Sequence, residues 1–404
     1  MSILDDYYKY FLPIYEPVDF VPHSGHGSHL YDINHNSIID FAGGVAASAL
    51  GQTNENLINT LHNQAKTLWH VGNIFTNYPQ LELAKKLITN TAFDKIFICN
   101  CGSEAVEAAL KIARRAAIKT HGEQKHEILA FDKAFHGRTL FSVTAGGQPK
   151  YWAGFEPLPP GIIHAPFNSL DNLDTLINKN TAAVIVEPIQ AEGGVIPATI
   201  EFLQKLRELC DKHDAALIFD EVQTGMGRTG DLFAYMGYNV TPDIITIAKS
   251  LANGFPIGVM MTIDKFAHGF EFASHGATFG GNPLSCAVAN ATFDMINDKN
   301  LLNEVKTKHT IFTNKLREIN QELDVYCEIR GRGLLIGAEL NDKYKGLAYK
   351  LVRLAVKYGV SVLNASPNVT RFLPALNIPV DDIITGLERL KLALIEFKNC
   401  DMSN

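Results

Sequence analysis

The chain has 404 residues, of which 46% are hydrophobic and 20% are charged, a balance typical of a globular protein. A chain of this length is expected to form a large domain and a smaller one. The net charge is -7 and no Lys/Arg-dense run is present, which argues against a nucleic-acid partner. No apolar stretch approaches the roughly 18 residues of a membrane-spanning helix, so no membrane partner is expected.

Compartment and metal content are indicated by the first residues and by the cysteines. Asp5 and Asp6 stand where a secretory signal would carry basic residues. The six cysteines are scattered and form no C-x-x-C pair, so no zinc site is indicated. We therefore expect a cytoplasmic protein with reduced thiols and no metal.

The first two-thirds of the chain alternate β-rich runs with helical segments. Residues 1–55 contain short β-rich stretches at 30–32 and 38–41 and are expected to belong to a small domain. Residues 56–299 form the predicted large domain, in which residues 201–213 place Phe202, Leu206 and Leu209 on one helical face. Its buried β-rich runs are 95–99, 127–132, 162–165, 181–187, 215–220, 244–248 and 258–262. This alternation predicts an α/β fold with a mostly parallel seven-stranded sheet.

The remaining segment, residues 300–404, has a different pattern. A long helical stretch comes first, followed by a β segment around 333–340, another helix and a further β segment near 359–371. This order predicts a smaller α+β domain, against which the first 55 residues are expected to pack.

A single lysine stands at the end of the strand predicted over 244–248. Ligands of open α/β sheets bind beyond the carboxyl ends of the strands, so the Lys249 side chain would face the pocket. A neutral lysine amine can form a Schiff base with an aldehyde. Taken alone, the position fits a surface lysine at the start of a loop better.

The strand predicted over 215–220 ends in Asp220. A carboxylate there can cap a helix, pair with a cation, or keep the pyridinium nitrogen of a cofactor protonated. If Asp220 binds a cofactor in this way, Gln223 would reach the phenolic oxygen of the ring. The same stretch matches G-x-G-x-x-G at Gly225, Gly227 and Gly230. These glycines do not follow the strand directly and no βαβ spacing follows, which argues against a dinucleotide site.

Two Gly-containing turns offer hydroxyl groups to an anion. Gly102 and Ser103 precede a helix that is expected to run to about residue 119, and the free N–H groups of a helix start suit a phosphate. Simple N-capping by Ser103 fits the same residues. Thr278 lies in a second turn with Gly280 and Gly281, which can close over the same phosphate but is by itself only a turn.

The loop after the strand predicted over 127–132 carries Phe135, His136 and Arg138. Phe135 can stack on a planar ring, and Arg138 can bind a carboxylate through two hydrogen bonds. His136 suits acid–base chemistry, although a structural imidazole fits the same loop.

In their order and spacing these segments resemble the class III pyridoxal-phosphate-dependent aminotransferases, most closely the acetylornithine and succinylornithine aminotransferases. Residues 219–230 (Phe-Asp-Glu-Val-Gln-Thr-Gly-x-Gly-Arg-Thr-Gly), the Lys249 segment and residues 278–283 (Thr-Phe-Gly-Gly-Asn-Pro) carry the resemblance, which extends from residue 12 to residue 374. It implies the aspartate-aminotransferase-like fold (fold type I), pyridoxal 5'-phosphate as the cofactor, and a homodimer.

The resemblance also implies a role for each residue of the cofactor site. Lys249 would bind the cofactor as a Schiff base and transfer protons, and Asp220 would pair with the pyridine nitrogen. Phe135 and Val222 would sandwich the ring, and Gln223 would contact its oxygen.

The phosphate and the substrates are assigned in the same way. Gly102 and Ser103 would hold the phosphate, with Thr278 reaching it from the other subunit. Arg138, assisted by Tyr15, would bind the distal carboxylate of the substrate. Arg371 would bind the α-carboxylate of glutamate or 2-oxoglutarate. Glu192 would neutralise Arg371 when the other amino donor is bound.

The implied reaction is transfer of the terminal amine of N-acetylornithine or N-succinylornithine to 2-oxoglutarate, giving the N-acyl-glutamate 5-semialdehyde and glutamate, as in arginine biosynthesis. Ornithine and 4-aminobutyrate aminotransferases are alternatives within the family. An aminomutase of the same fold is an alternative of another class, and it needs no 2-oxoglutarate. A catalytically silent scaffold is a third, against which Lys249, Asp220 and Arg138 argue.

Overall fold

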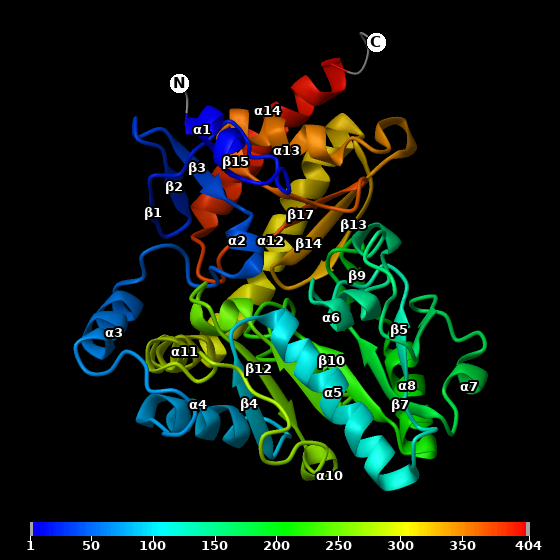
Figure 1. Ribbon diagram of the computed structural model, residues 1–404. Coiled ribbons are helices and arrows are strands. Elements are labelled where there is room, and N and C mark those ends of the chain that lie inside the picture. Colours follow the sequence, from blue (N-terminus) through cyan, green and yellow to red (C-terminus); the bar gives the residue numbers. More distant parts are fainter. Residues whose placement is uncertain (1–2, 401–404) are drawn as a thin grey trace.

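The structure is a computed structural model that describes residues 3–400 (Figure 1). The two terminal regions predicted above include residues that lie outside the described part of the chain, namely Met1, Ser2 and residues 401–404. None of the described helices is both long enough and apolar enough to span a lipid bilayer. Side chains are described for five of the six cysteines, all with free thiols, and that of Cys400 lies outside the description.

A seven-stranded sheet forms the centre of the molecule, in the order β4-β12-β11-β10-β7-β5-β6 (Figure 1). The strands are β4 (Lys95–Cys99), β5 (Glu127–Phe131), β6 (Ile162–Ala165), β7 (Thr181–Val186), β10 (Ala216–Asp220), β11 (Ile244–Ile247) and β12 (Gly258–Thr262). Only β12 runs antiparallel to its neighbours, β11 and β4, whereas the other pairs are parallel. The predicted α/β fold with a mostly parallel seven-stranded sheet is thus confirmed.

Both faces of this sheet are buried, which explains why its strands read as continuous apolar runs. Along β10, Ala216 and Ile218 belong to the hydrophobic cluster that contains α5 (Gly102–His121). Leu217 and Phe219 point to the other face and belong to the cluster that contains α8 (Ile200–His213). Side chains of a strand alternate between the two faces, so each face needs its own covering helices.

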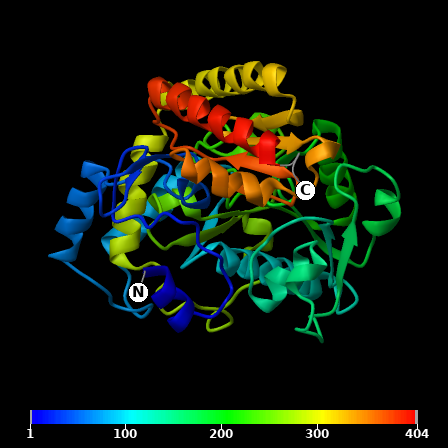
Figure 2. The ribbon, with the colours of Figure 1, turned by 90° about the horizontal axis from the view of Figure 1, so that it is seen from above.

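A second four-stranded sheet belongs to the C-terminal region and has the order β13-β14-β17-β16. Its strands are β13 (Tyr326–Arg332), β14 (Leu335–Leu340), β16 (Leu363–Ala365) and β17 (Val369–Phe372). The long helices of this region are α12 (Lys299–Leu323), α13 (Ala348–Lys357) and α14 (Val380–Cys400), and Figure 2 shows them side by side over the sheet.

The N-terminal segment joins the C-terminal region through a third sheet, ordered β1-β2-β3-β15. Its strands are β1 (Ser24–His26), β2 (His29–Tyr31), β3 (Ser37–Asp40) and β15 (Val360–Ser361), and β3 pairs in parallel with β15. The expected packing of the first residues against the C-terminal region is therefore observed, while domain boundaries at residues 55 and 299 stay a prediction.

The remaining helices and strands complete the fold. They are α1 (Ile3–Tyr10), α2 (Gly43–Ala46), α3 (Glu55–Ala65), α4 (Tyr78–Thr89), α6 (Leu140–Ala145), α7 (Leu173–Leu176), α9 (Ala234–Tyr238), α10 (Asp264–Ala267), α11 (Pro283–Ile296), β8 (Ile189–Gln190) and β9 (Ile196–Pro197). The parallel strands of the central sheet direct their carboxyl ends toward the small sheets, so the loops that follow β5, β7, β10 and β11 meet there (Figure 1).

Candidate active site

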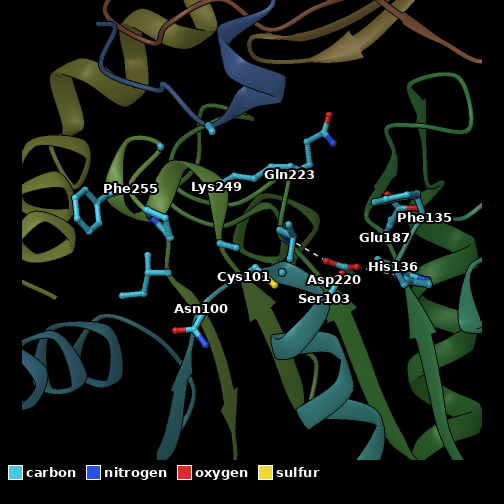
Figure 3. A pocket seen from close by; sticks show the side chains of 18 residues that line it. Asn100, Cys101, Ser103, Phe135, His136, Glu187, Asp220, Gln223, Lys249 and Phe255 are labelled. Atoms are coloured by element: carbon cyan, nitrogen blue, oxygen red, sulfur yellow. Dashed lines mark hydrogen bonds and ion pairs between the residues drawn. The ribbon is translucent and has the colours of Figure 1, made fainter. Parts of the chain in front are cut away.

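A cavity of about 350 Å³ lies at the carboxyl ends of β10 and β11 (Figure 3). Its walls come from the turn between β4 and α5, the loop after β5, the ends of β7, β10 and β11, and the loop before β12. Residues far apart in the chain meet here because all these segments end at one edge of the sheet. The predicted site residues that line it are Gly102, Ser103, Phe135, Asp220, Val222, Gln223 and Lys249.

Lys249 follows β11 and opens the 3-10 turn Lys249–Ala252 with a left-handed backbone, φ 45°. Non-glycine residues held in this region store strain and occur preferentially at functional sites. Burial lowers the pKa of the Lys249 amine, and the charge of Arg371 lowers it further, against the opposing influence of Glu192 and Asp220. A lowered pKa increases the fraction of neutral amine, which is the form that attacks a carbonyl and accepts a proton.

Asp220 ends β10 and is bound on both carboxylate oxygens. Its Oδ2 lies 2.7 Å from Nδ1 of the buried His136, and its Oδ1 accepts hydrogen bonds from the Val222 N–H at 3.0 Å and the Thr246 hydroxyl at 3.1 Å. Burial lowers the pKa of His136, but the hydrogen bond and charge of Asp220 outweigh burial and raise it above its ordinary value. The cavity thus presents a firmly held acidic group, as a protonated ring nitrogen would require.

The His136 ring offers one further polar atom at the cavity wall. Nε2 of His136 is buried without a hydrogen-bond partner among the described residues. The imidazole is therefore anchored through Nδ1 alone, and its main contact in the described part of the chain is the carboxylate of Asp220.

The start of α5 forms the anion-binding part of the cavity. The N-cap is Cys101, and its side chain makes no capping hydrogen bond, so the alternative of N-capping by Ser103 is wrong. The Ser103 hydroxyl instead accepts a hydrogen bond from the Arg138 N–H at 3.0 Å. A Cβ atom on Gly102 would lie 2.8 Å from the Val222 side chain, and one on Gly137 would lie 2.2 Å from the Ser103 hydroxyl. Only glycine fits these positions, which leaves the helix N–H groups accessible to an anion.

Phe135 and Val222 line the cavity from two different loops, as expected for residues that hold a planar ring. The Phe135 ring meets the Tyr151 ring edge to face, with centroids 5.9 Å apart. The backbone N–H of Phe135 donates to Glu187 at 3.1 Å, which fixes the loop that carries the ring.

Arg371 lies on β17 and is 3% exposed. Its Nη1 donates to Glu192 at 2.5 Å and to the amide oxygen of Gln223 at 3.1 Å. Gln223 lines the cavity, whereas Glu192 lines a neighbouring groove of about 890 Å³. The predicted Glu192–Arg371 pair is thus present, and Gln223 connects it to the cavity.

The other predicted residues lie outside the cavity wall. The Arg138 guanidinium stacks 3.8 Å from the centroid of the Tyr151 ring and makes no ion pair with a described residue. Tyr15 is 75% exposed. Thr278 does not line this cavity but a separate hollow, which it shares with Glu104 of the first turn of α5.

Glu187 is a site residue that the sequence analysis missed. It directly follows β7 and lines the cavity while being only 6% exposed. Burial raises its pKa to about 7, although the charge of His136 opposes this shift. Its place at the carboxyl end of a buried parallel strand was the signal that could have identified it.

We expect Glu187→Gln to change how stability depends on pH. Burial raises the pKa of the folded carboxyl to about 7, from an ordinary value of 4.5. The folded state therefore binds more protons in this window, and the free energy of unfolding falls as pH rises through it. Glutamine keeps the acceptor for Phe135 but cannot ionise, so the stability of the variant at pH 8 relative to pH 5 should exceed that of the wild type by about 2 to 3 kcal/mol.

Urea unfolding of the cofactor-free proteins at the two pH values measures this difference. Glu123→Gln, at an exposed glutamate, is the control and should keep the wild-type pH profile. Parallel profiles for the wild type and Glu187→Gln would show that the carboxyl is ionised across the whole range.

Known proteins match this chain over nearly its full length. It is 51% identical over 383 residues to the acetylornithine/succinyldiaminopimelate aminotransferase of Yersinia pestis, with 95% of each chain covered. It is 50% identical over 389 residues to the succinylornithine transaminase/acetylornithine aminotransferase of Pseudomonas aeruginosa, with 96% of each covered. The crystal structure of N-acetylornithine aminotransferase from Stenotrophomonas maltophilia superposes with a TM-score of 0.87 at 36% identity, covering 98% of this chain and 100% of that one.

The family model described as aminotransferase class-III matches residues 13–394, which include every residue of the cavity wall. The lysine amine, the carboxylate of Asp220 and the helix start lie around one cavity. The chain belongs to the class-III aminotransferases and is a pyridoxal-phosphate-dependent transaminase.

Proposed function

We propose that this aminotransferase transfers the terminal amine of an N-acylated ornithine, N-acetylornithine or N-succinylornithine, to 2-oxoglutarate. The products are the N-acyl-glutamate 5-semialdehyde and glutamate. The observation that carries the proposal is the pairing of Arg371 with Glu192 behind the cavity, while Arg138 stays without a described acidic partner. The names of the relatives from Yersinia pestis and Pseudomonas aeruginosa, which specify acylated amines, support the same substrate class.

The charges of the two amino donors explain why a paired arginine is useful. Glutamate and 2-oxoglutarate carry two carboxylates and need two cations, Arg371 and Arg138. The reacting end of acyl-ornithine has no charge beside its amine, so an unpaired Arg371 there would leave a buried charge without compensation. Glu192 neutralises Arg371 for this substrate and releases it for the diacid, which lets one site accept both.

Pyridoxal 5'-phosphate fits the residues around the cavity. When bound, it supplies an aldehyde that attaches amines covalently and a ring that accepts electrons from the substrate carbon. Lys249 is the residue for the covalent attachment, and Asp220 is the partner for the pyridine nitrogen. Phe135 and Val222 would hold the two faces of the ring, and Gln223 its phenolic oxygen. Gly102 and Ser103 suit the phosphate, because a Cβ atom at Gly102 would collide with the Val222 side chain and only glycine fits there.

The proton transfers are assigned to Lys249. After the substrate amine has displaced it, the Nζ atom is free at the cavity wall, and its lowered pKa favours the neutral form. Nζ can then take the proton from the substrate carbon that bears the amine. It would deliver this proton to the cofactor carbon bonded to the substrate nitrogen. The buried Asp220–His136 pair lies at the cavity wall, where the carboxylate would keep the pyridine nitrogen protonated.

We further propose a homodimer in which Thr278 serves the cavity of the partner. In its own chain Thr278 lines a different hollow, and its neighbour Phe279 is 61% exposed. Trp69 and Phe75, exposed by 67% and 66%, add apolar surface of the kind that subunit interfaces cover. The role of Tyr15 in substrate binding, the cytoplasmic location and the place in arginine biosynthesis stay predictions.

We expect Lys249→Ala to lose covalent attachment of the cofactor. Borohydride reduction of the wild-type holoprotein should fix the cofactor on the peptide that contains residue 249, because no other described lysine lines the cavity. Mass spectrometry of the digest measures this, with Lys133→Ala, from the neighbouring groove, as the control that keeps the adduct. A reduced adduct of equal yield in Lys249→Ala would assign the linkage to another amine.

A substrate panel tests the reaction itself. We expect N-acetylornithine and N-succinylornithine to form glutamate from 2-oxoglutarate with a kcat/KM at least about tenfold above that of ornithine or 4-aminobutyrate. Ornithine would place an α-ammonium beside Arg138, 4-aminobutyrate has a shorter chain, and a loss of about 1.4 kcal/mol is a factor of ten. Glutamate is quantified in a coupled assay. Higher activity with unacylated ornithine or 4-aminobutyrate would favour those aminotransferases, and turnover that needs no 2-oxoglutarate would favour an aminomutase.

Removing the Glu192 carboxylate should separate the two half-reactions. In Glu192→Ala, Arg371 stays buried and loses its ion pair, so we expect the acyl-ornithine half-reaction to slow by about tenfold or more and the glutamate half-reaction by much less. Single-turnover absorbance of the bound cofactor follows each half separately. Glu328→Ala, which removes a glutamate that pairs with Arg330 in the same groove, is the control. Equal losses in both half-reactions would remove the switching role.

A further inference from the structure

Two cationic side chains share one aromatic ring beside the active site. The Arg138 guanidinium carbon lies 3.8 Å from the centroid of the Tyr151 ring, and Nζ of Lys150 lies 4.7 Å from the same centroid. Attraction to the ring quadrupole holds each cation there. Two positive charges on one ring repel each other, so an anion that contacts either of them stabilises the arrangement.

The groove next to the cavity does not supply that anion. Glu192, Glu328 and Glu339 line it together with Lys150. Glu192 pairs with Arg371, and the other two glutamates both pair with Arg330. Lys150 and Arg138 make no ion pair with any residue between 3 and 399. Each acidic group of the groove thus has a cationic partner of its own or, for Glu328 and Glu339, a shared one, and these two cations are left for a ligand.

The pair of cations lies between residues that line the cavity and residues that line the groove. Phe135 lines the cavity, and its ring contacts the Tyr151 ring edge to face at 5.9 Å. The Arg138 guanidinium is 5.5 Å from the Phe135 ring, so Arg138 is adjacent to the cavity and Lys150 faces the groove beyond it. A ligand whose amine reaches Lys249 would pass Arg138 before it reaches Lys150.

We propose that Lys150 is a specificity-determining residue that binds the terminal carboxylate of an N-succinyl group, while Arg138 binds the α-carboxylate of the same substrate. This inference rests on the proposed function and narrows its substrate class to amines acylated with a dicarboxylic acid. In N-succinylornithine six covalent bonds separate the two carboxylate carbons, which span at most about 7 to 8 Å. Two cations that both lie within 5 Å of one ring centroid match this separation. An acetyl group has no second carboxylate and leaves Lys150 in water.

The test is Lys150→Gln, which keeps a polar side chain and removes the charge. We expect the ratio of kcat/KM for N-succinylornithine to that for N-acetylornithine to fall about three- to tenfold, because the lost interaction is a partly exposed ion pair. Raising the ionic strength should lower the same ratio in the wild type and leave it unchanged in the variant, since salt screens exposed charges. Lys133→Gln is the matched control, because Lys133 lines the same groove but is not one of the cations over the Tyr151 ring.

Binding is measured separately from turnover with two unreactive ligands. N-succinyl-norvaline and N-acetyl-norvaline lack the terminal amine, and calorimetry on the holoenzyme gives their Kd values. We expect the wild type to favour the succinyl ligand and Lys150→Gln to lose that preference. An unchanged preference in Lys150→Gln, or an equal loss in Lys133→Gln, overturns the assignment. Failure of the wild type to use either acyl-ornithine would instead contradict the proposed function.

Discussion

The parallel pairing of β10 with β11 is the constraint on which the site depends. In this register Asp220 lies opposite Thr246, whose hydroxyl binds the Asp220 carboxylate, and the chain of β11 continues by two residues to Lys249. Because parallel strands end at the same edge, the acidic group and the reactive amine face one cavity. Both faces of the sheet are packed with apolar side chains, so neither strand can shift without exposing its core residues.

Around this pair the protein neutralises its buried charges locally. Asp220 is compensated by His136, Arg371 by Glu192, and Glu187 has a raised pKa of about 7 because of burial. An uncompensated charge in such surroundings would be costly, so each one has a partner or keeps its proton. Lys249 is the exception that catalysis needs, because burial lowers the pKa of its amine and favours the neutral nucleophile.

Selectivity between substrates follows from a different arrangement of charges. Arg371 is paired and buried, whereas Arg138 is stacked on Tyr151 and open to a ligand. The paired arginine can be released for a diacid, and the open one is available to every substrate. Lys150 extends this open positive region into the groove, where the length and charge of the acyl group would be recognised.

The sequence by itself determined the strands and helices of the central sheet and the residues at their carboxyl ends, because apolar periodicity and the motif around Lys249 are local properties of the chain. It also indicated the Glu192–Arg371 pair through resemblance. Only the tertiary structure decided that Ser103 binds the Arg138 backbone, that Glu187 lines the cavity, and that Thr278 lines a separate hollow. These facts depend on contacts between loops far apart in the chain, whose side-chain directions no local pattern encodes.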